Sequence, residues 1–357
     1  MEHLFEIEER ARRFVVAEGA RACVGRDPSC EVAIDHPLLG RRALSIEAGG
    51  GACFATPTGP SGAFVEGYRL PARAPLSIGA RVALLPDLHL ALIARGARLD
   101  ARTPSASWPS LVRSLFADLR DQHALGHTLD LGGPGSIFVA EDGRGYVLAG
   151  RATAEGGMLL HNPVHLAPER IGGAPTPASD VFALASIVYA ELEGCPAWDA
   201  PAGALAIAAK LTAAPRAPTS SDRFARALGP HVMRALDRDP GRRPTAITLS
   251  RTAALGELQV TLWNEISSLA ARYSGYRSVW AGVEPGDSSW DDYEDAKELY
   301  RFFLRWQNEL EPIDATMFAN ESAYLAAARE ALERAQAGGQ GPGIGRSLLA
   351  RLGERSA

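Results

Sequence analysis

The sequence predicts a multidomain chain in which an all-β sandwich is followed by a mainly α-helical domain and then by an α-helical C-terminal domain. Three observations support this order. Short apolar-alternating segments separated by glycine, proline and aspartate fill residues 1–98. A helix start signal precedes a long apolar run near residue 180, and amphipathic helical patterns dominate from residue 257. A chain of 357 residues has room for two or three such cores.

Composition excludes several functional classes. The net charge of −5 predicts no broad electrostatic footprint for nucleic acid. The four cysteines have no CxxC spacing, and the chain does not open with a charged segment followed by an apolar one, so a cytoplasmic protein with reduced thiols is expected. No apolar run approaches the ~20 residues that a membrane-spanning helix requires, so no membrane insertion is predicted.

Residues 1–98 are predicted to form an antiparallel β-sandwich. The apolar-alternating segments include EVAID, ALSIEA, ACFATP, AFVEGYRL, LSIGARVALLP and HLALIA. Between them lie turn-forming clusters such as DPS, AGGG and TGPSG. Many short strands punctuated in this way are typical of a sandwich.

Three segments of this region resemble a forkhead-associated (FHA) domain, a family that binds phosphothreonine peptides. The segments are VGRDPSCEVAIDHPLLGRRALSI, GPSGAFVEGYRL and PLSIGARVALLP. The resemblance implies that Arg26 is the phosphate-contacting arginine and that Arg41 occupies the second basic position. A guanidinium fork is well suited to hold a phosphate.

Other binding positions of that family are changed. Gly40 stands where the family has a serine that donates to the phosphate, and Ala43 replaces the histidine that braces the loop. Ser61 and Glu66 stand where asparagines hold the peptide backbone. A carboxylate at Glu66 repels a phosphate and has no hydrogen to donate. These changes favour an interaction platform or spacer, with phosphothreonine recognition as the alternative.

A short polar linker, ARLDARTPSAS, is predicted at residues 97–107, and a second domain is predicted over residues 108–256. Thr176 and Pro177, followed by Ser179 and Asp180, form a helix start signal. Apolar residues then lie nearly all the way round the helix, namely Val181, Leu184, Ala185, Ile187, Val188 and Leu192. A helix that is apolar all round is a buried one.

The second domain resembles the C-terminal lobe of protein kinases. The resemblance is carried, in order, by SLVRSLFADLRDQHALG, SIFVAEDGRGYVLAG, the triplet Ala167-Pro168-Glu169 with its following helix, and HVMRALDRDPGRRPTA. It implies a buried ion pair between Glu169 and Arg243. It also implies that Asp180 holds the backbone of the loop that carries catalysis in active kinases.

The catalytic residues of that family are absent at the matching positions. Aligned on the motif QHALG, the base position is Leu131 and the metal-binding asparagine is Ser136. The metal-binding DFG triplet corresponds to residues 149–151, Ala-Gly-Arg. The short linker also leaves no room for a kinase N-lobe with its glycine-rich loop and strand lysine. The prediction is a pseudokinase with no catalytic residue. Asp130, one residue from the base position, leaves open an atypical kinase-like enzyme.

No metal or cofactor site is predicted. His161 and His165 lie four residues apart, as do His123 and His127, which is a spacing that holds zinc on a helix. Neither pair has a nearby set of Cys, Asp or Glu ligands, and proline or glycine interrupts each segment.

Residues 257–337 are predicted to form a helical bundle or extension. The segment LQVTLWNEISSLAARY places Leu258, Leu262, Ile266 and Leu269 on one face. Two further helices are expected in DYEDAKELYRFFLRWQNEL and ESAYLAAAREALERAQA. Residues 338–357 are predicted to be a flexible glycine-rich tail.

The predicted function is that of a non-catalytic protein–protein interaction scaffold or adaptor in a bacterial signalling, secretion or defence assembly. Its expected partners are other proteins, phosphorylated ones included, and its oligomeric state is not predicted. Two alternatives are an adaptor that reads phosphothreonine peptides through Arg26 and Arg41, and an atypical kinase-like enzyme that uses Asp130.

Overall fold

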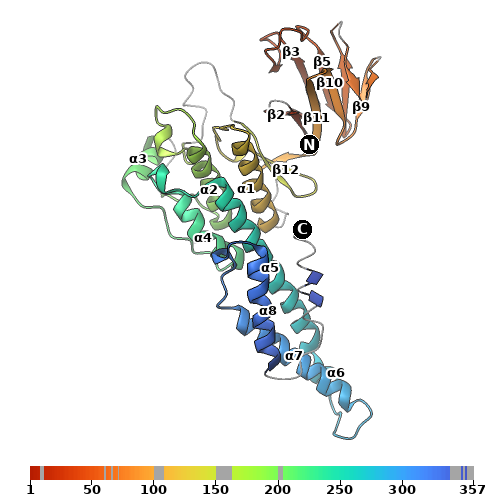
Figure 1. Cartoon of the computed structure of the whole chain (residues 1–357), viewed down its shortest axis with the longest axis vertical. Helices are drawn as coiled ribbons and strands as arrows, with labels where there is room; N and C mark the ends of the chain where they lie inside the picture. Colours follow the sequence, from red (N-terminus) through yellow and green to blue (C-terminus); the bar gives the residue numbers. More distant parts are fainter. Residues whose placement is uncertain are drawn as a thin grey trace. The chain divides into compact units, whose positions relative to one another are not determined.

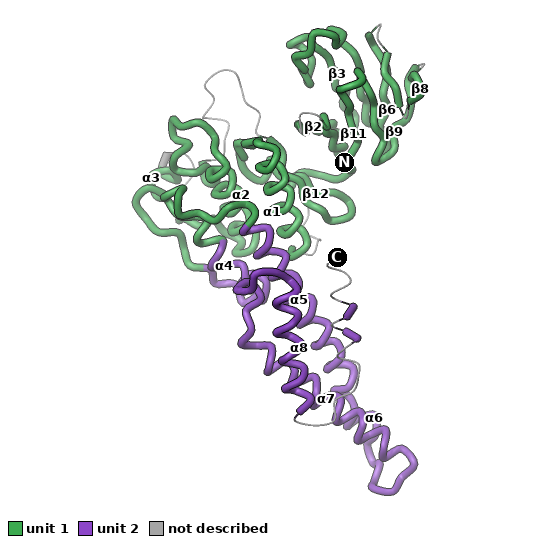
Figure 2. Tube along the Cα trace, viewed as in Figure 1, with its two compact units in different colours: residues 1–217, 232–247 green, residues 218–231, 248–357 purple. Residues whose placement is uncertain are grey.

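The computed structural model describes residues 1–8, 12–59, 62–65, 67–70, 72–99, 108–149, 163–199, 204–337, 347–348 and 350–351. The chain divides into two compact units, drawn in different colours in Figure 2. Unit 1 contains residues 1–217 and 232–247, and unit 2 contains residues 218–231 and 248–357.

The N-terminal part of the chain is built from two β-sheets, which confirms the prediction of an all-β region followed by a mostly helical remainder (Figure 1). The first sheet has the order β13-β12-β11-β10-β7-β8, with β1 paired to β11 and β2 paired to β1. Its strands are β1 (Glu2–Ile7), β2 (Arg12–Ala17), β7 (Phe64–Val65), β8 (Tyr68–Arg69), β10 (Arg81–Leu85), β11 (Leu88–Arg98), β12 (Ile137–Ala140) and β13 (Gly145–Val147). The second sheet has the order β4-β3-β5-β6-β9. Its strands are β3 (Arg21–Gly25), β4 (Val32–Ala33), β5 (Leu44–Gly49), β6 (Ala52–Pro57) and β9 (Ala74–Leu76).

The core of the sandwich follows the alternation of the sequence. Along β11, Leu88, Leu90 and Leu92 are buried while the residues between them are half-buried. They join a core from both sheets that includes Phe5, Val24, Ile46 and Val82. Each such side chain contributes about 1.5 to 3 kcal/mol by leaving water.

The first sheet continues into the region predicted to be a separate domain. The last residues of β11 pair with β12, with Gly96 opposite Ala140 and Arg98 opposite Phe138. A Cβ at Gly96 would lie 2.0 Å from the carbonyl oxygen of Val139, so this close pairing requires glycine. The sheet therefore links the two sides of the predicted linker at 97–107, and the predicted domain boundaries stay a prediction.

Helix α1 (Trp108–Ala124) covers the outer edge of this extension, which is formed by strand β13. Ser114 Oγ accepts a hydrogen bond from the Gly145 amide at 2.8 Å, and Asp118 Oδ2 accepts one from the Val147 amide at 2.7 Å. Because these side chains satisfy the outward amides of β13, no further strand is needed at this edge.

Helix α2 (Pro177–Glu193) is the buried helix that the sequence predicts. Thr176 caps its first turn, and Thr176 and Ser179 exchange side-chain hydrogen bonds with each other's backbone amides. Every residue from Ser179 to Tyr189 is buried. Gly194 ends the helix at a left-handed φ of 69°. Helix α3 (Ala204–Thr212) follows later in unit 1.

Unit 2 is helical. Its elements include the first part of α4 (Arg223–Ala235), most of α5 (Ala246–Ser274), α6 (Tyr276–Val279), α7 (Trp290–Leu310) and α8 (Glu321–Ala337). The predicted face of Leu258, Leu262 and Ile266 packs with Phe303 and Trp306 in one apolar core. The predicted boundary at residue 257 falls inside α5. Most of the predicted tail, 338–357, lies outside the described residues, but Leu348 is buried in this core.

None of the helices in the described ranges combines the length and the apolar character that crossing a membrane requires.

Candidate functional site

Two loops at one end of the sandwich bring Arg26 and Arg41 into neighbouring positions. The Arg26 amide donates to the Gly40 carbonyl at 3.0 Å, and the Asp27 amide donates to the Arg41 carbonyl at 2.9 Å. A Cβ at Gly25 would lie 2.2 Å from the Arg41 carbonyl oxygen, so the close approach of the loops depends on this glycine. The side chains of Arg26 and Arg41 are exposed.

The charges at this end are mixed. Arg26 Nη1 donates to the Pro37 carbonyl at 3.2 Å, which leaves most of its guanidinium facing solvent. Asp27 lies close by, and hydrogen bonds from Ser29, assisted by the charges of Arg41 and Arg42, hold the pKa of its carboxyl below the usual value. The surface is therefore cationic but partly neutralised.

The two changed positions in the described loops differ in the space around them. A Cβ at Gly40 would meet nothing closer than the Arg42 carbonyl oxygen at 3.6 Å, which is an ordinary contact, so the fold does not exclude serine there. Ala43 is buried in the sandwich core. Ser61 and Glu66 lie outside the described residues.

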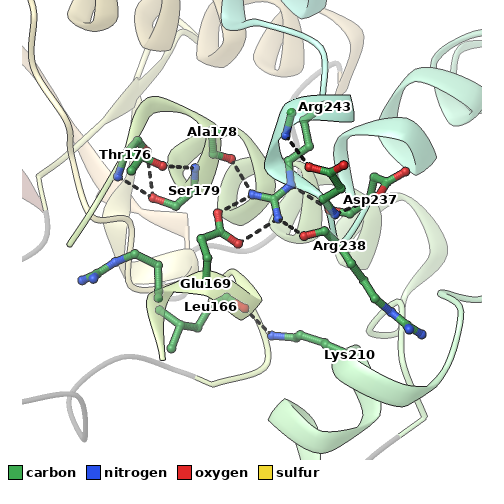
Figure 3. Close-up of polar contacts among 12 residues, drawn as sticks. Leu166, Glu169, Thr176, Ala178, Ser179, Lys210, Asp237, Arg238 and Arg243 are labelled. Atoms are coloured by element: carbon green, nitrogen blue, oxygen red, sulfur yellow. Dashed lines mark hydrogen bonds and ion pairs between the residues drawn. The ribbon is translucent and has the colours of Figure 1, made fainter. Parts of the chain in front are cut away.

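Glu169 and Arg243 form the ion pair that the kinase resemblance implies (Figure 3). Arg243 Nη1 and Nη2 donate to the two carboxylate oxygens of Glu169 at 2.5 and 2.8 Å. The remaining N–H groups of Arg243 donate to the carbonyls of Ala178, Asp237 and Arg238 at 3.0, 2.7 and 3.2 Å. All five guanidinium donors are thereby satisfied, as burial requires, because the Arg243 side chain is fully buried.

Lys210, which sequence reasoning did not single out, lies next to this ion pair in Figure 3. Its Nζ donates to the carbonyls of Pro163 and Leu166 at 2.5 and 2.7 Å and lies over the rings of Phe182 and Trp198. Burial lowers its pKa to about 7. The sequence signal for this residue is rarity, because the chain has only one other lysine, Lys297.

The buried lysine predicts a pH dependence of stability. Between pH 7 and its ordinary value of 10.5, the unfolded chain binds a proton at Lys210 that the folded chain has lost, so folded stability rises with pH. We expect the free energy of unfolding of the wild type, relative to that of Lys210→Met, to rise by up to about 1.4 kcal/mol per pH unit. Urea unfolding at pH 7, 8 and 9 measures this gain. Lys297→Met is the control, and a constant difference between wild type and Lys210→Met would contradict the prediction.

Asp180 anchors the backbone of the loop that follows helix α1, as the kinase resemblance predicts. Its carboxylate is fully buried and accepts hydrogen bonds from the amides of Leu129 and Asp130 at 2.8 and 2.9 Å. His123 Nε2 lies 3.2 Å from the same carboxylate. Leu131, at the position of the catalytic base, is buried. These contacts give the loop a structural anchor.

Asp130 is also held in structural bonds. Its backbone has a left-handed φ of 51°, which is uncommon for a residue with a side chain. Its Oδ1 accepts two hydrogen bonds from Arg170, from Nε at 2.9 Å and from Nη2 at 2.7 Å. The carboxylate is therefore paired with a cation on the segment after Glu169.

Ser136 and Ala149 stand at two positions where the kinase resemblance implies metal ligands, and neither has a carboxylate side chain. Ser136 Oγ accepts a hydrogen bond from the Gly132 amide at 2.9 Å, and Ala149 is an exposed alanine. Residues 150 and 151 and His161 lie outside the described residues. Within the parts of the chain that the structure describes, no group of three His, Cys, Asp or Glu side chains is placed to hold a metal ion.

Comparisons with known proteins return similarities only among solved structures. No family model and no curated protein matches the chain. An FHA domain from a study of phosphothreonine-dependent interactions is 15% identical, covers 27% of this chain and 98% of its own, and has a TM-score of 0.25. The FhaA FHA domain in complex with the intracellular domain of Rv3910 is 16% identical, with coverages of 25% and 97% and a TM-score of 0.23. The FHA-1 domain of Rv1747 from Mycobacterium tuberculosis is 22% identical, with coverages of 26% and 99% and a TM-score of 0.23. Similarities at these scores do not by themselves establish a function.

Proposed function

We propose that this protein is a non-catalytic protein–protein interaction scaffold. The observation that supports it best is the state of the loop at residues 129–136. Asp180 engages the backbone of this loop, Asp130 is paired with Arg170, and Leu131 is buried. Phosphoryl transfer by a kinase needs carboxylates that are free to hold magnesium and to accept a proton. The carboxylates here instead stabilise the loop.

The continuous sheet supports the same proposal. Pairing of β11 with β12 fixes the sandwich to the hairpin that follows the braced loop. A fixed arrangement suits a protein that presents loops and helices to partners. The proposed setting is a bacterial signalling, secretion or defence assembly, and the proposed partners are other proteins.

We expect the purified protein to bind no Mg-ATP. The measurement is the melting temperature with and without millimolar Mg-ATP, with magnesium alone as the control, and no shift is expected. A single exposed ion pair supplies about 1 kcal/mol or less, far below the ~8 kcal/mol of micromolar binding. A rise of several degrees that Asp130→Asn removes would replace the scaffold proposal by an enzymatic one.

A second candidate function is an adaptor that reads phosphothreonine peptides. The observation in its favour is the hydrogen bond between the Arg26 amide and the Gly40 carbonyl, which brings the two arginine-bearing loops together. Two exposed guanidinium groups on adjacent loops are a suitable start for a phosphate site. The loop has Gly40 at the position where FHA domains have a serine, so it lacks the hydroxyl that donates to the phosphate.

We expect the wild type to bind phosphothreonine peptides more weakly than ~10 μM, or about −7 kcal/mol. We expect Gly40→Ser to strengthen binding about tenfold or more, because a hydrogen bond to a charged group contributes about 1.5 to 3 kcal/mol. Calorimetry against a degenerate phosphopeptide library measures both, with Gly40→Ala as the matched control. Wild-type binding tighter than ~10 μM that Arg26→Ala abolishes would favour the adaptor over the scaffold.

A further inference from the structure

Two cysteines enclose the loop that carries Arg26. Cys23 lies in β3, and Cys30 lies just before β4. The two strands pair in parallel, with Val24 opposite Val32, and the Cys23 amide donates to Glu31 Oε2 at 2.7 Å. This register brings the two ends of the loop together, and it places the thiols of Cys23 and Cys30 close to each other.

The two thiols have different surroundings. Cys23 is half-buried, whereas Cys30 is buried, and both are reduced. Burial, together with the neighbouring Cys23 thiol, raises the pKa of Cys30 to about 12. Because the thiolate is the nucleophile in thiol chemistry, Cys23 is the thiol that reacts first with an oxidant from solvent.

We propose that Cys23 and Cys30 are a redox modification site that forms a reversible disulfide across the Arg26 loop. The oxidant is a low-molecular-weight disulfide such as oxidised glutathione. The Cys23 thiolate attacks one sulfur of that disulfide and releases one glutathione thiolate, which leaves glutathione bonded to Cys23. Cys30, as its thiolate, then attacks the Cys23 sulfur and releases the second glutathione. Two protein thiols are oxidised, and one disulfide is reduced to two thiols.

The Cys23–Cys30 disulfide would affect both the Arg26 loop and the Arg41 loop. Cys30 Sγ donates to the Arg41 carbonyl at 3.6 Å, and a sulfur in a disulfide has no hydrogen to donate. Oxidation therefore removes one anchor of the Arg41 loop while it closes the Arg26 loop into a ring. The disulfide itself does not depend on whether these loops bind a peptide.

Trypsin separates the two cysteines and so provides a direct test. Cleavage after Arg21, Arg26 and Arg41 leaves Cys23 in peptide 22–26 and Cys30 in peptide 27–41. The reduced full-length protein is equilibrated under native conditions in glutathione buffers with an increasing oxidised share, quenched with acid, alkylated and digested. We expect mass spectrometry to find the two peptides joined, two hydrogen atoms lighter than their sum, and separated again by dithiothreitol.

Three variants make the test specific. Cys23→Ser and Cys30→Ser are each expected to abolish the joined peptides, and Cys195→Ser, which changes another half-buried cysteine, is expected to keep them. Two results would overturn the proposal. One is complete alkylation of both cysteines in the buffer with the highest proportion of oxidised glutathione. The other is a glutathione that stays bonded to Cys23 while no joined peptide forms.

Discussion

Replacing Arg243 by alanine is expected to lower the free energy of unfolding by about 3 to 5 kcal/mol, because it removes a fully buried guanidinium and leaves the half-buried Glu169 carboxylate without its counter-charge. The Glu169 carboxylate loses both of its donors, and three backbone carbonyls lose theirs. The guanidinium also lies over the Phe182 ring, 4.8 Å from its centre, so apolar packing is lost as well. Urea unfolding of both proteins measures the difference.

Arg242→Ala is the matched control for this prediction. Arg242 is the preceding residue, its side chain is 75% exposed, and its ion pair with Asp239 spans 3.6 Å. Its loss should cost well under ~1 kcal/mol, as expected for an exposed pair. Arg243→Lys should give an intermediate loss, because it keeps the charge but loses the planar fork. Equal losses in the free energy of unfolding for Arg242→Ala and Arg243→Ala would show that the Glu169–Arg243 pair stabilises the fold no more than an exposed ion pair does.

The residues around this ion pair show what could be predicted from the sequence. The resemblance to the kinase C-terminal lobe implies the pairing of Glu169 with Arg243, because both residues stand at matching positions of its motifs. It implies the contact of Asp180 with the loop backbone in the same way. The carbonyl partners of Arg243 could not be predicted, because they depend on the path of the loop at residues 237–243 and on its position beside the first turn of helix α2. Lys210 was missed for a related reason. Its partners are the carbonyls of Pro163 and Leu166, and a carbonyl is present at every residue.

The pairing of β11 with β12 across the predicted linker does not follow from the sequence, because a sequence pattern indicates a strand but not its partner. Alternating apolar residues predict that β11 is a strand, but they do not predict which strands pair with it. The polar composition of residues 97–107 predicts a linker. Strand β11 continues to Arg98 and pairs there with β12, about 40 residues later in the chain. The sandwich core, in contrast, was predictable, because each strand carries its own period of two.

An ion pair that the sequence does not predict joins β2 of the sandwich to helix α1. Arg13 in β2 donates from Nη1 to Asp118 at 2.5 Å and from Nε to Glu6 at 2.8 Å. The side chains of Arg13 and Asp118 are 9% and 11% exposed. Arg13 also donates to the Val147 carbonyl at 3.3 Å and lies over the Tyr146 ring. One arginine therefore connects β2 with three other elements of unit 1, namely β1, α1 and β13.

Arg13→Ala is expected to cost about 3 to 5 kcal/mol at neutral pH, because it leaves Asp118 desolvated without its cation. The matched control is Arg144→Ala, which removes an exposed arginine from an Arg–Asp pair next to β13 and should cost under ~1 kcal/mol. A double-mutant cycle with Asp118→Ala isolates the pair, and a coupling energy near zero would contradict this role for Arg13.

The same variant has a distinctive pH dependence. Burial already raises the pKa of Asp118, and hydrogen bonds from Arg13 oppose that rise, so loss of Arg13 raises the pKa further. Between the unfolded pKa and the raised folded pKa, the folded variant binds a proton that the unfolded chain lacks, and its stability increases as pH falls. The deficit of Arg13→Ala relative to wild type should therefore be full above the folded pKa of Asp118 in the variant, and it should shrink as the pH falls below that value towards the wild-type folded pKa. Loss of apolar packing alone would give a deficit that does not change with pH, so urea unfolding over a series of acidic to neutral pH values separates the two causes.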